Sequence, residues 1–364
     1  MTKKATIVIL LLSLIWYMGC GREKVNDLEI ARQEIQEHAY SQAEIRLEKL
    51  LKKQPQNVEA QCILAAVYNR QNKTQKLGET VQKLRELGNP SVEKLVDIMK
   101  REKNLADDMA KLLTLVGKSA IEPLILLLGD SDEYVREDAI QVLTNMGNQA
   151  IESLNEALAS SNALIKAGAA RVLGNIGDKT AIKSLVKSLG DADLHVRVES
   201  AIALHKLGDK SHEDIITIGL GSDQIPVRRS AAIAMRDIVE KPVVAPLLRA
   251  ARDSDMQVRA AAIQALGKVK DAKVVASLID GIKSTDNTIR DAAAIALKEI
   301  GELAVMPLLD LIKQEQNIAV LQKAIQILGD IGDKRAIDPL EKIYAESKQH
   351  ILKQEAAVAL NKIE

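Results

Sequence analysis

The chain of 364 residues contains no phenylalanine, and aromatic residues make up only 2% of it although hydrophobic residues make up 47%. A core without large rings must be built from Leu, Ile, Val and Ala, which suits closely packed helices. The 8 prolines and 19 glycines are too few for an all-β chain with many turns. An excess of one charge is also missing, because 50 basic residues balance 50 acidic ones. This balance argues against the strong positive field of a nucleic-acid binder.

The first twenty residues, MTKKATIVILLLSLIWYMGC, have the organisation of an export signal. Two lysines precede an uncharged, mostly apolar run from Ala5 to Met18. This run is shorter than the about 20 residues that a spanning helix needs, and it fits the hydrophobic part of a secretory signal. With Gly19 before Cys20, the segment resembles a bacterial lipoprotein signal, although Tyr17 stands where that pattern usually has Leu. The resemblance implies that residues 1–19 are a signal peptide.

The same resemblance implies a cellular location for the protein. It predicts export and anchoring to the bacterial cell envelope through a lipid on Cys20, while an uncleaved N-terminal anchor is the alternative. Gly21, in place of Asp, then favours the periplasmic side of the outer membrane in a double-membrane cell. Cys62, the second of the two cysteines, would have no disulfide partner in the chain. Its apolar spacing predicts a small buried residue rather than a reactive thiol.

A repeat of 30 to 32 residues runs through most of the remaining chain. Segments such as VREDAIQVLTNMG (135–147) and VRAAAIQALGKVK (258–270) recur with apolar residues at helical spacing. A second recurring unit, such as AIEPLILLLGD, lies between them. Residues 90–364 are therefore predicted to form about nine stacked antiparallel helix pairs, which bury one continuous core only when neighbouring pairs stack.

Helix ends are marked at the same repeat positions. A glycine, which enters the left-handed conformation cheaply, closes many of the second helices. These glycines are Gly117, Gly147, Gly177, Gly208, Gly301 and Gly332. A short side chain that can accept hydrogen bonds from the first turn precedes the second helix of each pair. These residues are Asp132, Asn162, Asp193, Asp223, Asp255 and Asp286.

The pattern in DADLHVRVESAIALHKLGD (191–209) resembles HEAT repeats, specifically the short kind first noted in phycobilisome lyases. The resemblance covers about three quarters of the chain and implies an all-α, right-handed α-solenoid over residues 90–364. Residues 20–89 differ, because AEIRLEKLLKKQPQN (43–57) and VEAQCILAAVYNRQNK (58–73) resemble a tetratricopeptide repeat. We expect this segment, after the lipid-attachment cysteine, to be a helical cap on the solenoid, with the junction at Asn89–Pro90.

Charged residues recur with the repeat and should form a structural ladder along the stack. Its basic members are Arg136, Arg197, Arg228, Arg259 and Arg290, with Lys166 in the gap. Its acidic members are Asp132, Asp193, Asp255 and Asp286. We expect each arginine to pair with a neighbouring loop acid and so to tie adjacent repeats, because acids at the same period cancel the field. The alternative is that the row of arginines binds anions.

The sequence has no catalytic motif, and we predict no enzyme activity, cofactor, metal or nucleic acid as a ligand. The repeats resemble in fold those of deoxyhypusine hydroxylase, a family that binds iron through several His-Glu pairs, but this chain lacks that set and we expect no di-iron enzyme. Here His212-Glu213 is the only such pair among five histidines. A phycobilisome-lyase-like activity, or another enzyme on the same scaffold, is the alternative. Stacking of sugars or bases would also need more aromatic rings than this chain has.

One group of outward positions on the second helices is apolar in the middle repeats. With Ala139 taken as the centre of the core face, the opposite positions include Val198, Ile202, Ile233 and Ile295, with Arg229 and Asp291 beside them. These six residues predict a shallow apolar patch that binds a protein segment. The alternative is packing between repeats that extends over a wide apolar face. The sequence therefore favours a membrane-anchored scaffold for protein–protein interaction, with a purely architectural envelope spacer as a further alternative.

Overall fold

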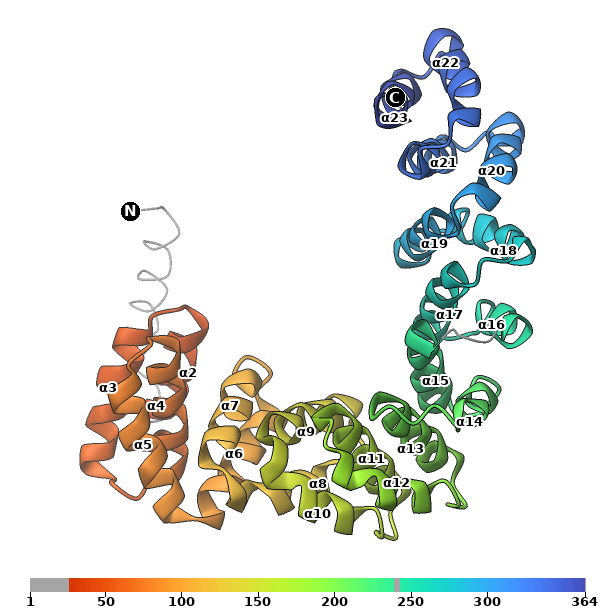
Figure 1. The fold of residues 1–364 in the computed structure, drawn as a ribbon. Helices are drawn as coiled ribbons and strands as arrows, with labels where there is room; N and C mark the ends of the chain where they lie inside the picture. Colours follow the sequence, from red (N-terminus) through yellow and green to blue (C-terminus); the bar gives the residue numbers. More distant parts are fainter. Residues whose placement is uncertain (1–25, 239–242, 364) are drawn as a thin grey trace, which may run out of the picture. The chain divides into compact units, whose positions relative to one another are not determined.

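The structure, a computed structural model, describes residues 26–238 and 243–363 (Figure 1). Every regular element in these two ranges is a helix, which confirms the predicted all-α helical-repeat solenoid. The predicted signal and Cys20 lie outside the described residues. The chain divides into two compact units, one ending at Ala150 and one beginning at Ile151.

The first unit begins with four helices from the segment that resembles a tetratricopeptide repeat. They are α2 (Asp27–Gln36), α3 (Tyr40–Lys53), α4 (Val58–Arg70) and α5 (Thr74–Leu87). The rest of the unit is α6 (Asn89–Arg101), α7 (Ala106–Val116), η1 (Lys118–Ala120), α8 (Ile121–Leu127), α9 (Glu133–Met146) and η2 (Gly147–Ala150). The junction predicted at Asn89–Pro90 is the start of α6, and the domain division there stays a prediction.

The second unit continues the alternation of a first and a second helix. The first helices are α10 (Ile151–Ala157), α12 (Ile182–Ser188), α14 (Glu213–Gly219), α16 (Val244–Ala250), α18 (Ala272–Ile282), α20 (Glu302–Gln314) and α22 (Ile337–Glu346). The second helices are α11 (Ala163–Ile176), α13 (Leu194–Lys206), α15 (Ile225–Ile238), α17 (Met256–Lys268), α19 (Asn287–Ile300), α21 (Ile318–Ile331) and α23 (His350–Ile363). Short 3₁₀ turns, η3 (Lys179–Ala181) and η4 (Lys334–Ala336), precede α12 and α22.

The described residues form nine helix pairs, from α6 and α7 to α22 and α23, as the repeat predicts. Within the second unit, each second helix packs against the second helix of the next pair, so these helices form one layer and the first helices another (Figure 1). The core between them is aliphatic, with Val258, Ile263, Leu278 and Leu328 almost fully buried. Ala side chains on the second helices let neighbouring helices approach closely.

The predicted helix ends are largely confirmed. Each of the six predicted terminating glycines has a positive φ. Asp132, Asn162, Asp193, Asp255 and Asp286 are all N-cap residues whose side chains accept a first-turn amide hydrogen bond. The prediction for Asp223 is wrong, because α15 begins at Ile225 and the carbonyl of Gln224 accepts from the amide of Arg228. Gln224 therefore holds the capping position, one residue later.

Cys62 lies in α4 and is fully buried, as its apolar spacing predicts, and its thiol is free. Burial raises the pKa of its thiol to about 12, so the thiol stays protonated near neutral pH. Between residues 26 and 363, leaving out 239–242, no helix has the length and apolar character needed to cross a membrane.

Candidate protein-binding surface

The seventh residue of each repeat segment marks an equivalent position on the second helices of the second unit. We call this set of positions the outward row. Its members are Arg171, Ile202, Ile233, Gln264, Ile295, Gln326 and Val358. Ile233 is 41% exposed, Ile295 52% and Val358 51%, so three apolar members of the row face solvent. The layered packing of the second helices places this row along one side of the second unit.

Two predicted members of the apolar patch do not reach the surface. Val198 is fully buried and Ile202 is 8% exposed, so their predicted outward placement is wrong. The first helix α14 carries Gly219, and the Val198 side chain packs where a side chain at Gly219 would otherwise lie. Ile202 belongs to the same core cluster, because α13 is buried around most of its circumference. The alternative of packing between repeats holds at these two positions.

The two charged members of the predicted patch are held by the next repeat. Arg229 of α15 donates two hydrogen bonds to the carboxylate of Asp255, over distances of 3.0 and 2.6 Å. Asp291 of α19 accepts from the ammonium group of Lys323 on α21 at 3.1 Å. The outward row is therefore flanked by paired charges rather than by a field of one sign.

The ladder arginines have different acceptors from those predicted. Each donates from Nη1 to the backbone carbonyl six residues earlier, in the loop before its own helix. The donor–acceptor distances are 2.7 Å for Arg136, 2.8 Å for Arg197, 2.8 Å for Arg228, 2.7 Å for Arg259 and 2.6 Å for Arg290. The predicted acids, such as Asp132 and Asp193, instead use their side chains to cap the helix. The arginines therefore fix their own loops, and Arg228 in addition pairs with a loop acid of the next repeat, Asp253, as the predicted ties between repeats require.

Ion pairs between repeats use a second set of acids that the sequence analysis missed. Asp130, Asp191 and Asp253 lie six residues before a ladder arginine, and each accepts from a cation of the preceding repeat. The donors are Lys100 at 2.6 Å, Lys166 at 2.5 Å and Arg228 at 2.7 Å. The hydrogen bond from Lys100 also lowers the pKa of Asp130. The recurrence of Asp before three ladder positions was the signal that could have revealed these ties.

A buried polar group joins α13 to its neighbour α15. The carboxylate of Glu199, only 3% exposed, accepts a 2.5 Å hydrogen bond from the Ser230 hydroxyl and lies 3.6 Å from Nε2 of His195. Burial alone would raise the pKa of Glu199, but His195, the charge of Arg171 and the Ser230 hydroxyl together lower it. The carboxylate is thus ionised within the stack, where its partners hold adjacent repeats together.

Two further histidines among the described residues of the second unit each lie near one acid. Nδ1 of His205 is 3.2 Å from a carboxylate oxygen of Glu213, and Nε2 of His212 is 3.8 Å from Asp209. Within residues 26–238 and 243–363, no cluster of three or more His, Cys, Asp or Glu side chains could hold a metal ion. The predicted pair His212-Glu213 is split, because Glu213 faces His205.

Comparison with known proteins identifies the repeats. The sequence profile described as HEAT repeats matches residues 151–236, 213–298 and 278–361, which together span more than half of the chain. The chain therefore belongs to the HEAT-repeat family. A search of curated protein sequences finds no match.

Several solved structures are similar to this chain at low sequence identity. Human deoxyhypusine hydroxylase in complex with glycerol is 22% identical over 71% of this chain and 98% of its own, with a TM-score of 0.29. The Escherichia coli protein YibA is 21% identical over 66% of this chain and 91% of its own, with a TM-score of 0.44. A chain from a structure of Kap95p with RanGDP is 10% identical, covers 83% of this chain and 48% of its own, and has a TM-score of 0.50. This last likeness supports the helical-repeat fold alone.

Proposed function

We propose that the protein is an exported lipoprotein that acts as a scaffold for protein–protein interaction, tethered to the cell envelope by a lipid on Cys20. The proposed role in protein binding is supported by the exposure of Ile233 (41%) and Ile295 (52%) at equivalent positions of the outward row. Single exposed apolar residues are ordinary, but their recurrence at equivalent positions on one layer of a repeat stack gives a partner several apolar contact points along that layer.

The chemistry of the outward row favours a protein as the ligand. Its apolar members are separated by Gln264 and flanked by neutralised charge pairs, such as Arg229 with Asp255. Apolar anchors within a polar rim are typical of protein interfaces. The kinship of the repeats with phycobilisome lyases, and of residues 24–89 with tetratricopeptide repeats, rests on sequence patterns alone.

The proposed lipid anchor and location are tested by replacing Cys20 with Ala in the native cell. The protein is then followed by fractionation and by labelling with a fatty-acid analogue. We expect Cys20→Ala to abolish the label and to release or mislocalise the protein. Cys62→Ala is the matched control and should keep both label and location. Retention of the Cys20→Ala protein in the membrane fraction with its signal removed would refute the lipoprotein proposal.

The proposed protein-binding role is tested by chemical crosslinking in the same cells. We expect the double substitution Ile233→Glu and Ile295→Glu to remove crosslinked species that the unmodified chain forms. Ile218→Glu on α14, at a 59% exposed position of the other layer, should leave them unchanged. A crosslinking pattern that is the same in all three proteins would favour an architectural spacer instead.

A further inference from the structure

The first unit presents a basic surface on α3 that is separate from the outward row. Ile45, Lys49, Lys52 and Lys53 follow one another at helical spacing, so they lie on one side of the helix. All four are exposed, and Ile45 is 68% exposed. The opposite side of α3 is buried in the core of the unit. We call these four residues the basic face.

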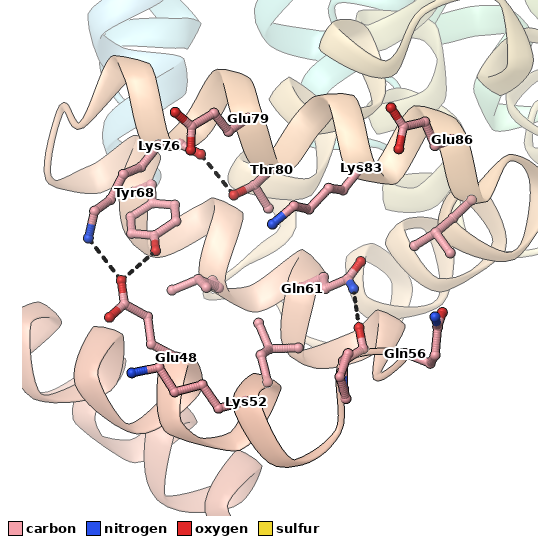
Figure 2. Close-up of a pocket in the computed structure, with 14 residues that line it drawn as sticks. Glu48, Lys52, Gln56, Gln61, Tyr68, Lys76, Glu79, Thr80, Lys83 and Glu86 are labelled. Atoms are coloured by element: carbon pink, nitrogen blue, oxygen red, sulfur yellow. Dashed lines mark hydrogen bonds and ion pairs between the residues drawn. The ribbon is translucent and has the colours of Figure 1, made fainter.

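The two acids of α3 do not neutralise the basic face, because they are already held by other cations. Glu44, only 6% exposed, pairs with Lys73 and with Lys76, the latter at 2.9 Å. Glu48 pairs with Lys76 at 2.8 Å and accepts a hydrogen bond from the hydroxyl of Tyr68 (Figure 2). Two carboxylates are thus balanced by two ammonium groups, and none of these belongs to the basic face.

The three lysines of the basic face have no ion-pair partner within residues 26–238 and 243–363. The neighbouring helix α2 has Asp27 and Glu34 near α3, but both pair with Arg46. Glu29, in the first turn of α2, is an exposed acid. Over residues 40–88, nine Lys and Arg side chains stand against five Glu and no Asp. This part of the first unit therefore keeps a net positive charge.

The basic face lies at the end of the unit where the chain enters it. Helices α2 and α3 pack against each other and are joined by three residues, so they run antiparallel. Arg46 of α3 lies 3.5 Å from the carboxylate of Asp27, in the first turn of α2. The three lysines follow Arg46 by three to seven residues, so they extend up to about 10 Å beyond the start of α2.

A lipid on Cys20 would hold this same end of the unit close to a membrane. Cys20 precedes Asn26, the first described residue, by six positions. Even a fully extended chain of this length spans at most about 20 Å. A tether this short keeps the basic face within reach of the headgroups and raises its effective concentration at the lipid surface.

We propose that the basic face of α3 binds the anionic headgroups of the membrane to which the protein is tethered; this inference rests on the proposed lipid anchor. The three ammonium groups contact lipid phosphates, and Ile45 enters the boundary between headgroups and acyl chains. Each lysine near an anionic surface strengthens binding about fivefold. An apolar side chain among cations is typical of helices that lie at this boundary. An acidic protein would also match the lysines, but the tether places a lipid surface beside them.

The test supplies the tether chemically, so its result does not depend on lipidation in the cell. The chain of residues 20–364, made without lipid, is coupled through Cys20 to a maleimide lipid in vesicles. Cys62 does not couple, because it is fully buried and its thiol stays protonated. The one tryptophan of the sequence is Trp16, so Ile45→Trp gives this chain a single fluorescent reporter. Brominated lipids quench the reporter when it reaches the acyl chains.

We expect quenching in vesicles that contain phosphatidylglycerol and phosphatidylcholine, and little in phosphatidylcholine alone or at high salt. Changing the three lysines of the basic face to glutamate should reduce quenching at least about fivefold. The matched control reverses three exposed lysines of η3 and α12 in the second unit, which changes the net charge equally and should stay within about twofold. These substitutions are Lys179→Glu, Lys183→Glu and Lys187→Glu.

Circular dichroism of each variant shows whether its helices are kept. The proposal is overturned if quenching is equal with and without phosphatidylglycerol, or if the basic-face variant and the control variant reduce it alike. Binding of a polyglutamate peptide to the basic face without any quenching by lipid would also overturn it, in favour of an acidic protein. None of these results bears on lipidation in the cell, which the fatty-acid label on Cys20 decides separately.

Discussion

Gly174 of α11 lies directly against Ala203 of α13, because a Cβ placed on Gly174 would be 2.7 Å from both Cα and Cβ of Ala203. The same relationship recurs in later repeats: Gly267 with Ala296, and Gly329 with Ala359. A glycine on one second helix thus receives the alanine of the next. At these three places the second helices can approach each other closely because the glycine has no side chain.

Gly174→Ala should lower the free energy of unfolding by about 1–3 kcal/mol, because backbone atoms of α13 must move to admit the new methyl group. This loss should exceed the gain in helix propensity, which is up to about 1 kcal/mol. Gly78→Ala in α5 is the control, since a Cβ there meets nothing within 4 Å and should add stability. Urea unfolding followed by circular dichroism measures both, and an unchanged midpoint for Gly174→Ala would contradict the close approach.

Arg228→Ala should cost more than Arg259→Ala. Both arginines donate to two loop carbonyls, but Arg228 also makes two hydrogen bonds with the carboxylate of Asp253, at 2.7 and 3.0 Å. We expect a loss of about 2–3 kcal/mol for Arg228→Ala, about 1 kcal/mol more than for Arg259→Ala. A double-mutant cycle with Asp253→Asn should give a coupling of about 1 kcal/mol. Equal losses without coupling would show that the tie between repeats is not stabilising.

The folded protein should lose stability in acid as Asp255 becomes protonated. Its hydrogen bonds from Arg229 lower its pKa to about 2 from an ordinary 3.8; burial opposes this shift and the first-turn amides support it. A lowered pKa in the folded state gives stability that is present above pH 3.8 and is lost as the pH falls through about 2. Asp255→Asn, which keeps the helix cap, should therefore reduce the loss of stability over this range by about 1 kcal/mol after solvent screening. Unfolding curves at pH values across this range measure the effect, and parallel pH profiles of the two proteins would refute it.

Ile202 and Ile233 share a repeat position but should respond differently to the same change. Ile202→Ser should lower the free energy of unfolding by about 2–4 kcal/mol, because it leaves a cavity in the core. Ile233→Ser should stay within about 0.5 kcal/mol, because its side chain is 41% exposed. Thermal or urea unfolding separates the two, and a large loss for Ile233→Ser would mean that the outward row is part of the core.

Much of the fold could be predicted because it depends on local rules that repeat. Each capping Asp, such as Asp193 before α13, needs only its own first-turn amides, and each terminating glycine, such as Gly177, needs only its own backbone. These signals recur at a fixed period, so the number of helix pairs could be read from the sequence. The burial of Cys62 followed from helical spacing in the same way.

The candidate sites depend on non-local packing, and this is where prediction failed. The geometry of one helix predicts that Val198 faces outward, but Gly219 on α14 has no side chain and leaves space in the core that Val198 fills. The pairing of Arg228 with Asp253 depends on the loop of the next repeat, 25 residues away. The closeness of the three lysines of α3 to the start of α2 depends on how these two helices pack, and no spacing in the sequence reports it.

The central claim is that the outward row contacts a partner, and site-specific photo-crosslinking in the native cell tests it most directly. A photoreactive residue is placed in turn at Ile233, at Ile295 and, as a control on the other layer, at Ile218. The account predicts that the first two positions crosslink to the same protein and that Ile218 does not. Crosslinking from Ile218 alone, or from none of the three positions while the protein stays folded and in place, would contradict it.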